Sequence, residues 1–250
     1  MYSIYFNNRC LAVCSSSEQL LNDTDAVIFS PSSNLVKSGK TSKTVPQTGE
    51  ILPLLQDHTK GALHSSGSSD ITPPIKLSQM DLSDLPALFQ NTPNIRKLYI
   101  PSNQELVTFK RLCTKLTSIQ AGGGLVTNNK GEYLLIFRHG VWDLPKGKQE
   151  PNEDIRQAAL REVEEECGVH DLEIKQHLCD TYHTYQLNGK FMLKCTHWYK
   201  MEYLGSCPDT KPQTEESIER AIWVTQNDLP DYLSHTYPSI QEVFRVHAGQ

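Results

Sequence analysis

Residues 147–169 read GKQEPNEDIRQAALREVEEECGV. Asn152 is a favoured N-cap residue and Gly168 a typical helix stop, so the stretch predicts a helix that begins after Asn152 and ends at Gly168. Four apolar residues recur at every fourth position of this helix and form one stripe: Ile155, Ala159, Val163 and Cys167. The stripe predicts that one face of the helix packs against a core.

Three glutamates, Glu162, Glu165 and Glu166, share a sector of the helix that overlaps the edge of the apolar stripe. Carboxylates that converge beside a core repel one another and lose hydration, so they are rarely buried without a cation. Most acidic runs are instead solvated faces, but Glu164 and Arg161 already supply the solvent side here. Hard oxygen ligands favour Mg²⁺ or Mn²⁺. We therefore expect a divalent-cation site whose substrate is a phosphate anhydride.

The same stretch matches the Nudix box, G-x5-E-x7-R-E-U-x-E-E-x-G-U with U aliphatic, at every defined position. The chain thus resembles the Nudix hydrolases, and the resemblance implies hydrolysis of a phosphate anhydride by water that a metal activates. It implies metal ligands at Glu162, Glu165, Glu166 and the carbonyl of Gly147. It also gives Arg161 and Glu153 supporting roles around the acidic cluster, and leaves open which glutamate is the general base.

Cations and one aromatic residue precede the acidic helix at Arg138, Trp142, Lys146 and Lys148. We interpret them as substrate-binding residues, because cations can clamp phosphate oxygens during phosphoryl chemistry. Core packing is the alternative for Trp142, and ordinary surface charge is the alternative for the two lysines. The Pro-Lys-Gly-Lys run around Gly147 is similar to that of Nudix hydrolases of diadenosine polyphosphates, inositol pyrophosphates and capped RNA, which suggests a long phosphate chain.

The polar loop at residues 210–216 ends with two glutamates. This region contains candidates for a further catalytic glutamate. Many Nudix enzymes carry one in this region, and we favour Glu216 over Glu215 and Glu219. Solvated loop acids are the alternative for each of them. His183 and His197 lie in expected strands, where a single histidine is more often structural than functional.

Strand patterns flank the acidic helix on both sides. Residues 125–127 and 133–137 surround one turn, and residues 174–185 and 191–203 surround an Asn-Gly turn. Residues 220–224 predict another strand, and short helices are expected near 227–235 and from Pro238. This order predicts the α/β class, and the resemblance implies an α/β/α sandwich around a mixed sheet.

The resemblance covers only residues 116–250, which we expect to form the hydrolase domain. For residues 1–115 we expect a small α+β domain with strands at 2–6, 26–29 and 97–100 and helices at 82–90 and 106–119. Gly122–Gly124 would then connect this domain to the catalytic sheet. Residues 37–74 are rich in Ser, Thr, Gly and Pro and predict a mobile loop.

The charge balance and the cysteine content indicate which kinds of partner and which compartment to expect. Residues 1–115 hold 11 Lys and Arg against 9 Asp and Glu, residues 116–250 hold 13 against 20, and the net charge is −5. This balance disfavours nucleic acid and membrane surfaces as partners. The seven scattered cysteines and the lack of a long apolar run favour a reduced, cytoplasmic compartment. A homodimer interface or a cover over the active site are the two roles we consider for residues 1–115.

The sequence therefore predicts a Mg²⁺- or Mn²⁺-dependent pyrophosphohydrolase of a nucleoside or dinucleoside polyphosphate. A nucleotide-sugar or dinucleotide pyrophosphatase is the alternative within the enzyme class. A non-catalytic Nudix ligand sensor is the alternative outside it, although sensors usually have an eroded box and a basic partner domain, whereas this box is intact.

Overall fold

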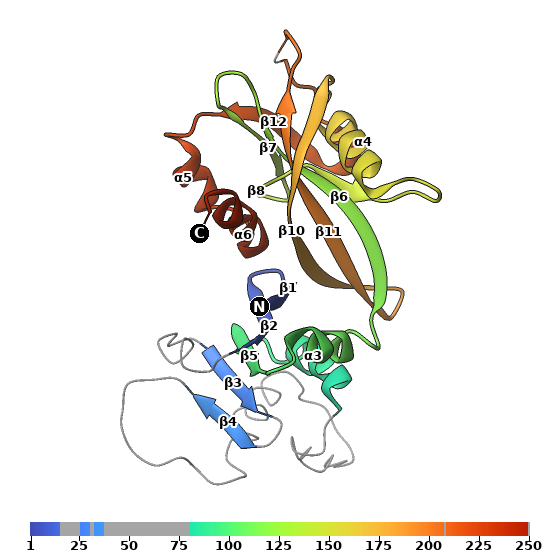
Figure 1. Ribbon diagram of the computed structural model, residues 1–250, viewed down its shortest axis with the longest axis vertical. Coiled ribbons are helices and arrows are strands. Elements are labelled where there is room, and N and C mark those ends of the chain that lie inside the picture. The colour runs from blue at the N-terminus through green and yellow to red at the C-terminus, as the bar shows by residue number, and fades with distance from the viewer. Residues whose placement is uncertain (16–25, 31–32, 38–80, 208, 250) are drawn as a thin grey trace, which may run out of the picture. The chain divides into compact units, whose positions relative to one another are not determined.

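The computed structural model describes residues 1–15, 26–30, 33–37, 81–207 and 209–249. The backbone separates into two compact units, Met1–Lys115 and Leu116–Gln250 (Figure 1). Of the loop expected at 37–74, only Lys37 lies within the described residues. No helix in the described ranges is long and apolar enough to cross a membrane.

The second unit is built on a mixed sheet with the strand order β12-β7-β6-β11-β10. β6 and β11 pair in parallel, and the other neighbours are antiparallel. Two short strands, β8 and β9, pair with β7 and β6. The bounds are β6 Thr117–Thr127, β7 Tyr133–Arg138, β8 Val141–Asp143, β9 Lys146–Lys148, β10 Leu172–Leu187, β11 Lys190–Tyr203 and β12 Ile218–Val224.

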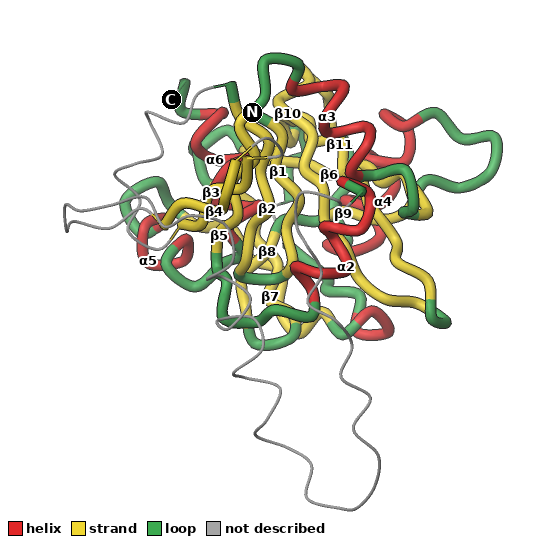
Figure 2. Tube along the Cα trace, turned by 90° about the horizontal axis from the view of Figure 1, so that it is seen from below, coloured by secondary structure: helices red, strands yellow, loops and turns green. Residues whose placement is uncertain are grey.

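Helices cover both faces of this sheet, which confirms the α/β class and the sandwich (Figure 2). On one face, α4 packs its stripe of Ala159, Val163 and Cys167 against β6, β7 and β11 in one core. On the other face, α6 buries Ile240, Val243 and Phe244 in a second core. The bounds are α4 Ile155–Cys167, a 3₁₀ helix η5 Thr214–Glu216, α5 Leu229–Leu233 and α6 Pro238–His247.

The start of α4 differs from the prediction. Asp154, not Asn152, is the N-cap, and its side chain accepts from the backbone N–H of Arg156 in a capping box completed by Gln157. Asn152 stands in the preceding turn at φ 66°. The predicted stop is confirmed, because Gly168 adopts the left-handed conformation at φ 68°.

Gly122, Gly123 and Gly124 do not link two domains as we expected, because they lie inside β6. A Cβ atom on Gly122 would stand 2.6 Å from the backbone nitrogen of Ala159 in α4, and one on Gly124 would stand 2.8 Å from Cγ2 of Val163. A Cβ atom on Gly123 would meet the ring of Trp198 on the opposite face. The three glycines therefore let α4 and Trp198 approach β6 closely from its two sides.

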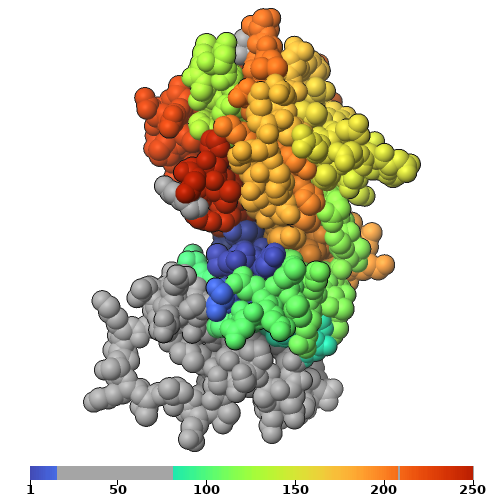
Figure 3. Space-filling view, viewed as in Figure 1, coloured from blue at the N-terminus to red at the C-terminus, as the bar shows by residue number. Residues whose placement is uncertain are grey.

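The long hairpin of β10 and β11 confirms the predicted Asn-Gly turn, with Asn188 at φ 50° and Gly189 at φ 73°. Its register shifts between His177 and Cys179, where β10 contains a bulge. In the view of Figure 3, the amber surface of β10 lies between α6 in red and α4 in yellow.

The first unit has its own mixed sheet, in the order β1-β2-β5-β3-β4. The predicted helix at 106–119 is wrong beyond Leu112, because the β-branched residues from Thr117 onwards pair with β11 instead. The bounds are β1 Tyr2–Phe6, β2 Arg9–Cys14, β3 Ala26–Ser30, β4 Ser33–Lys37, η4 Leu82–Asp84, α2 Leu85–Gln90, β5 Lys97–Pro101 and α3 Glu105–Leu112.

Candidate active site

The carboxylate of Glu162 lies directly over the backbone of Gly147. A Cβ atom at Gly147 would stand 1.8 Å from Oε2 of Glu162, so any larger residue would displace this side chain. Glu162 is 7% exposed, and burial raises its pKa, although the neighbouring Arg161 opposes that shift. β9 and α4 therefore bring together the glycine and the first glutamate of the motif.

Arg161 connects most of the acidic cluster. Its Nε and Nη2 donate to the two oxygens of Glu153 at 2.8 and 3.0 Å. Its Nη1 donates to Glu162 at 2.9 Å and to Glu165 at 2.8 Å, and Nη2 also reaches the carbonyl of Lys148 at 3.1 Å. These bonds raise the pKa of Arg161, so it stays charged. Arg161 thus fixes the carboxylates of three glutamates relative to β9.

Glu166 is fully buried, and each of its oxygens has a partner. Oε2 accepts from the backbone N–H of Lys146 at 2.8 Å, and Oε1 accepts from Nη1 of Arg138 at 3.2 Å. Burial raises the pKa of Glu166 to about 7, despite the opposing charges of Lys146 and Arg138. The side chain therefore has one position but incomplete charge compensation, and an additional cation would stabilise its ionised form.

Asp143 holds the two cations that surround Glu166. Arg138 donates to Oδ2 of Asp143 at 3.1 and 3.2 Å, and Nζ of Lys146 lies 2.5 Å from the same oxygen. Burial alone would raise the pKa of Asp143, but the two cations lower it. Burial also lowers the pKa of Lys146. Arg138 and Lys146, which we expected to bind substrate, are thus already paired with carboxylates of the site.

The other two substrate-binding candidates lie elsewhere. Trp142 is 9% exposed, and its ring packs 4.9 Å from that of Phe137 and 4.8 Å from that of Tyr232. Its burial supports the packing alternative. Lys148 exposes its side chain and contributes its carbonyl oxygen, which accepts from Arg161.

Loop 210–216 runs past the end of α4. The backbone N–H of Lys211 donates to the carbonyl of Cys167 at 2.7 Å, and that of Gln213 donates to the carbonyl of Glu166 at 3.1 Å. Glu216, which is exposed, raises the pKa of Glu162 through its charge and so lies within electrostatic range of the cluster. Glu215 and Glu219 are exposed as well.

Lys194, which the sequence did not single out, and His183, for which a structural role was the favoured interpretation, lie near these cations. Lys194 and His183 are directly opposite each other on β11 and β10. Burial and the charges of Lys146 and Arg138 lower the pKa of Lys194 to about 8, and Lys194 makes no ion pair within the described part of the chain. Burial, Lys146 and Lys194 lower the pKa of His183 to about 4, which leaves it neutral.

The residues present fit a divalent cation. Glu162 and Glu166 are buried beside Glu165, which is 48% exposed and keeps the cluster open to solvent. Burial raises the pKa of both inner glutamates, and the Gly147 backbone leaves room for the carboxylate of Glu162. Such an all-oxygen site suits a hard cation, and Nudix hydrolases generally use divalent metal ions.

Two named relatives match part of this chain. An RNA pyrophosphohydrolase of Pelagibacter ubique is 24% identical over 143 residues, which is 50% of this chain and 90% of that protein. The putative mutator protein MutT4 of Mycobacterium tuberculosis is 32% identical over 97 residues, 38% of this chain and 37% of that protein.

Two solved structures cover about half of the chain. An Ap4A hydrolase of C. elegans is 23% identical with a TM-score of 0.42, covering 52% of this chain and 96% of that chain. A NUDIX hydrolase of Nitrosomonas europaea is 25% identical with a TM-score of 0.42, covering 53% and 90%. The model of the NUDIX domain family matches residues 119–244, which is 126 of the 250 residues. The chain therefore belongs to the NUDIX domain family and is a Nudix hydrolase.

Proposed function

We propose that this protein is a Mg²⁺- or Mn²⁺-dependent pyrophosphohydrolase that cleaves a phosphate anhydride in a nucleoside or dinucleoside polyphosphate. The observation that supports an anionic, phosphate-rich substrate is the environment of Lys194. It is partly buried, close to Arg138 and Lys146, and without an ion-pair partner in the described residues. The charges of Glu166 and Asp143 offset its burial only in part, since its pKa still falls to about 8. An anionic substrate group would therefore relieve an existing desolvation penalty.

Glu162, Glu165, Glu166 and the carbonyl of Gly147 would hold the cation. When bound, it would neutralise phosphate oxygens and activate water. Arg161 keeps three of the surrounding carboxylates in one arrangement. Arg138 and the backbone of Lys146 do the same for Glu166, so these are positioning residues.

A proton must leave the attacking water, and two carboxylates could accept it. Glu165 is half-exposed, and its described bond is to Arg161. Glu216 is exposed on the loop that is tied to the end of α4. Glu216→Gln distinguishes them: a fall in kcat of roughly 10²- to 10⁴-fold would assign the general base to Glu216, and an unchanged kcat would assign it to Glu165, which is also a cation ligand.

The phosphate chain would lie along the face of the sheet that carries Lys146, His183 and Lys194. Gly123 pairs with both Lys146 and Trp198, and Lys194 shares the face of Trp198, four residues away on β11. Lys146 joins the two regions, because its backbone N–H binds Glu166 of α4 while its side chain lies on the opposite face of the sheet, which also carries Lys194. A series of cations beyond the glutamate cluster favours a polyphosphate over a nucleotide sugar, which has only two phosphates.

An RNA 5′-pyrophosphohydrolase is the second candidate, because several relatives at 24–26% identity over about half of the chain carry that name. The acidic balance of residues 116–250 favours the small substrate over RNA.

The experiment is a cleavage panel at fixed Mg²⁺ or Mn²⁺ with diadenosine tetraphosphate, nucleoside triphosphates, a nucleotide sugar, an inositol pyrophosphate and 5′-triphosphorylated RNA. Glu166→Gln is the control for the site. Preferential cleavage of a dinucleoside or nucleoside polyphosphate that Glu166→Gln abolishes is the expected result. Preference for RNA or for the nucleotide sugar would select the corresponding alternative. Nucleotide binding without any cleavage would indicate a ligand sensor.

A further inference from the structure

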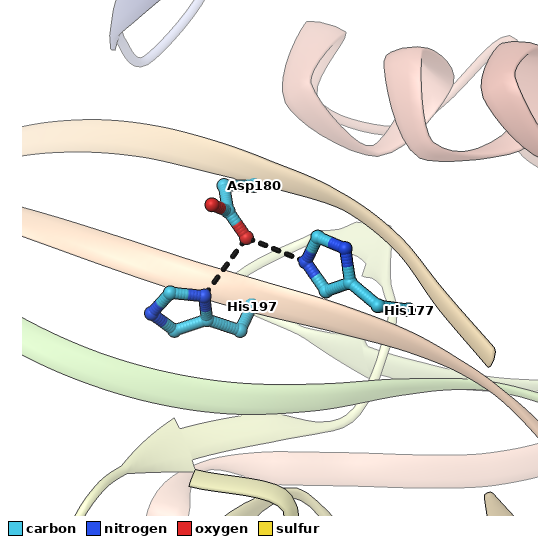
Figure 4. A group of neighbouring side chains, drawn as sticks. All are labelled: His177, Asp180 and His197. Carbon is cyan, nitrogen blue, oxygen red and sulfur yellow. Dashed lines mark hydrogen bonds and ion pairs between the residues drawn. The ribbon is translucent and has the colours of Figure 1, made fainter.

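A second cluster of metal-ligating side chains lies on the hairpin of β10 and β11, separate from the glutamates. His177, Asp180 and His197 each offer one ligand atom, and these atoms all lie within 4.8 Å of one another. Nε2 of His177 lies 2.7 Å and Nδ1 of His197 2.8 Å from the same oxygen, Oδ1 of Asp180. Figure 4 shows both rings turned toward that carboxylate.

A backbone irregularity creates this cluster. Residues three apart in a regular strand point to opposite faces, so His177 and Asp180 should lie on opposite sides of β10. The register shift at Leu178 removes this alternation: His177 pairs with Tyr199, and Asp180 pairs with His197. Since Tyr199 and His197 are two apart on β11, all of these side chains share one face. Bulges often redirect side chains in this way at functional sites.

His197 also has the outer partner that a metal-bound imidazole needs. Its Nε2 lies 2.8 Å from Oε1 of Gln120, whose amide donates to the hydroxyl of Ser118 at 2.9 Å. The amide oxygen therefore faces Nε2–H of His197 and leaves Nδ1 directed at Asp180. Ligating histidines typically donate their second ring N–H in this manner, which sets the tautomer and the ring orientation.

Two ring nitrogens directed at one carboxylate oxygen require positive charge between them, as protons or as a metal ion. Zinc binds imidazole at about 2.0–2.1 Å and carboxylate at about 2.0–2.2 Å, which separates tetrahedral ligands by roughly 3.3 Å. The two observed ring-to-carboxylate separations, 2.7 and 2.8 Å, are shorter than this, and all three ligand atoms lie within 4.8 Å of one another, so the side chains would rearrange around a bound ion. His177 is 46% exposed, so a cation can reach the cluster from solvent.

We propose that His177 Nε2, His197 Nδ1 and Asp180 bind a borderline divalent transition-metal ion, Zn²⁺, with a fourth position open to solvent. The ligand set distinguishes this site from the glutamate cluster, because imidazole nitrogen suits zinc whereas carboxylate oxygens suit Mg²⁺ or Mn²⁺. The ion would link the bulge of β10 to β11 and stabilise the hairpin.

The test uses the full chain with Cys207→Ser, which removes an exposed thiol that could bind zinc, and with Mg²⁺ in excess to occupy the glutamates. Zn²⁺ binding is measured by calorimetry and by the rise in Tm. We expect one tight site in this protein and in its Glu166→Gln variant. His177→Asn and His197→Asn should each weaken it by more than the roughly 10- to 100-fold that loss of an outer partner costs. His170→Asn, which removes a histidine exposed outside the cluster, is the matched control.

A second measurement does not depend on the folding of any variant. Imidazole nitrogen NMR of the parent protein should show Zn²⁺ shifting Nε2 of His177 and Nδ1 of His197, and Co²⁺ should give a visible spectrum without a thiolate charge-transfer band. Zn²⁺ binding that persists in both histidine variants, zinc that shifts neither ring, or no zinc binding at all would each overturn the assignment. None of these outcomes depends on anhydride cleavage, so they leave the proposed function untouched.

Discussion

Gly147 and Glu162 are in such close contact that no side chain fits between them: Oε2 of Glu162 stands 1.8 Å from where a Cβ atom of Gly147 would be. The close approach places a buried carboxylate against the backbone of Gly147, and carboxylate and backbone carbonyl oxygens are both suitable ligands for a hard cation. The glycine of the motif is therefore needed for space, not for an unusual backbone conformation.

Gly147→Ala should displace the carboxylate of Glu162 and raise the Mg²⁺ concentration needed for half-maximal activity by roughly 10- to 100-fold. The flexible end of Glu162 can move, so the fold should persist. Metal titration of activity with circular dichroism tests both points. Gly189→Ala is the control, because it strains a turn with nothing within 4 Å of the new Cβ and should leave the Mg²⁺ dependence unchanged. Identical titrations for Gly147→Ala and the parent would refute this role.

Glu166→Gln should lower kcat at least about 100-fold, since it removes a charged ligand while keeping the shape of the side chain. Glu164→Gln is the matched control on the same helix, because that side chain is 39% exposed and faces solvent. Its kcat should stay within about twofold of the parent value. Similar kcat values for the two variants would show that the buried position has no special role.

Arg161→Lys should destabilise the metal-free protein by about 2 kcal/mol, because an ammonium group cannot reproduce the two-pronged bond to Glu153 together with the bonds to Glu162 and Glu165. Urea unfolding measures this loss. Arg156→Lys, at an exposed position of the same helix, should change the free energy of unfolding by less than about 0.5 kcal/mol. Equal effects at the two positions would mean that the network of Arg161 adds nothing to stability.

Lys194 should make substrate binding depend on pH. Its pKa of about 8 means that it loses its charge as the pH rises through 8. KM for a polyphosphate should therefore increase above pH 8, by up to about tenfold per pH unit if only the charged form binds. Lys194→Arg keeps the charge and should abolish this increase, whereas Lys194→Met should have a high KM at every pH. A KM profile shared by all three proteins would exclude Lys194 from the phosphate site.

The charge of Lys194 should favour substrate binding but lower the free energy of unfolding. Because its folded pKa lies below the unfolded value of 10.5, the unfolded chain binds the proton more tightly between pH 8 and 10.5. The charged form therefore destabilises the folded protein below pH 8, and this penalty disappears as the pH rises toward 10.5. Urea unfolding of the parent and of Lys194→Met at pH 7 and 10 should show a smaller gain with pH in the variant.

Local patterns predicted α4 well because its apolar stripe and its glycine stop follow from helix periodicity and from backbone sterics. The N-cap was two residues off, since Asn152 and Asp154 have similar propensities and only the capping box with Gln157 selects Asp154. The glycines of β6 were misread as a linker for a related reason. Their function is to admit Ala159 and Trp198, which are distant in sequence.

The sequence by itself determined the family, the box helix and the shared sector of Glu162, Glu165 and Glu166, because those features depend on spacing within one contiguous segment. Tertiary structure alone decided that Arg138 and Lys146 are paired with Asp143, that Trp142 packs in the core and that burial lowers the pKa of Lys194. It also brought His177 and Asp180 to one face through a bulge. These relationships depend on which strands pair and on which side chains become buried. Both are set by contacts between segments that are distant in sequence, so a local sequence pattern does not reveal them.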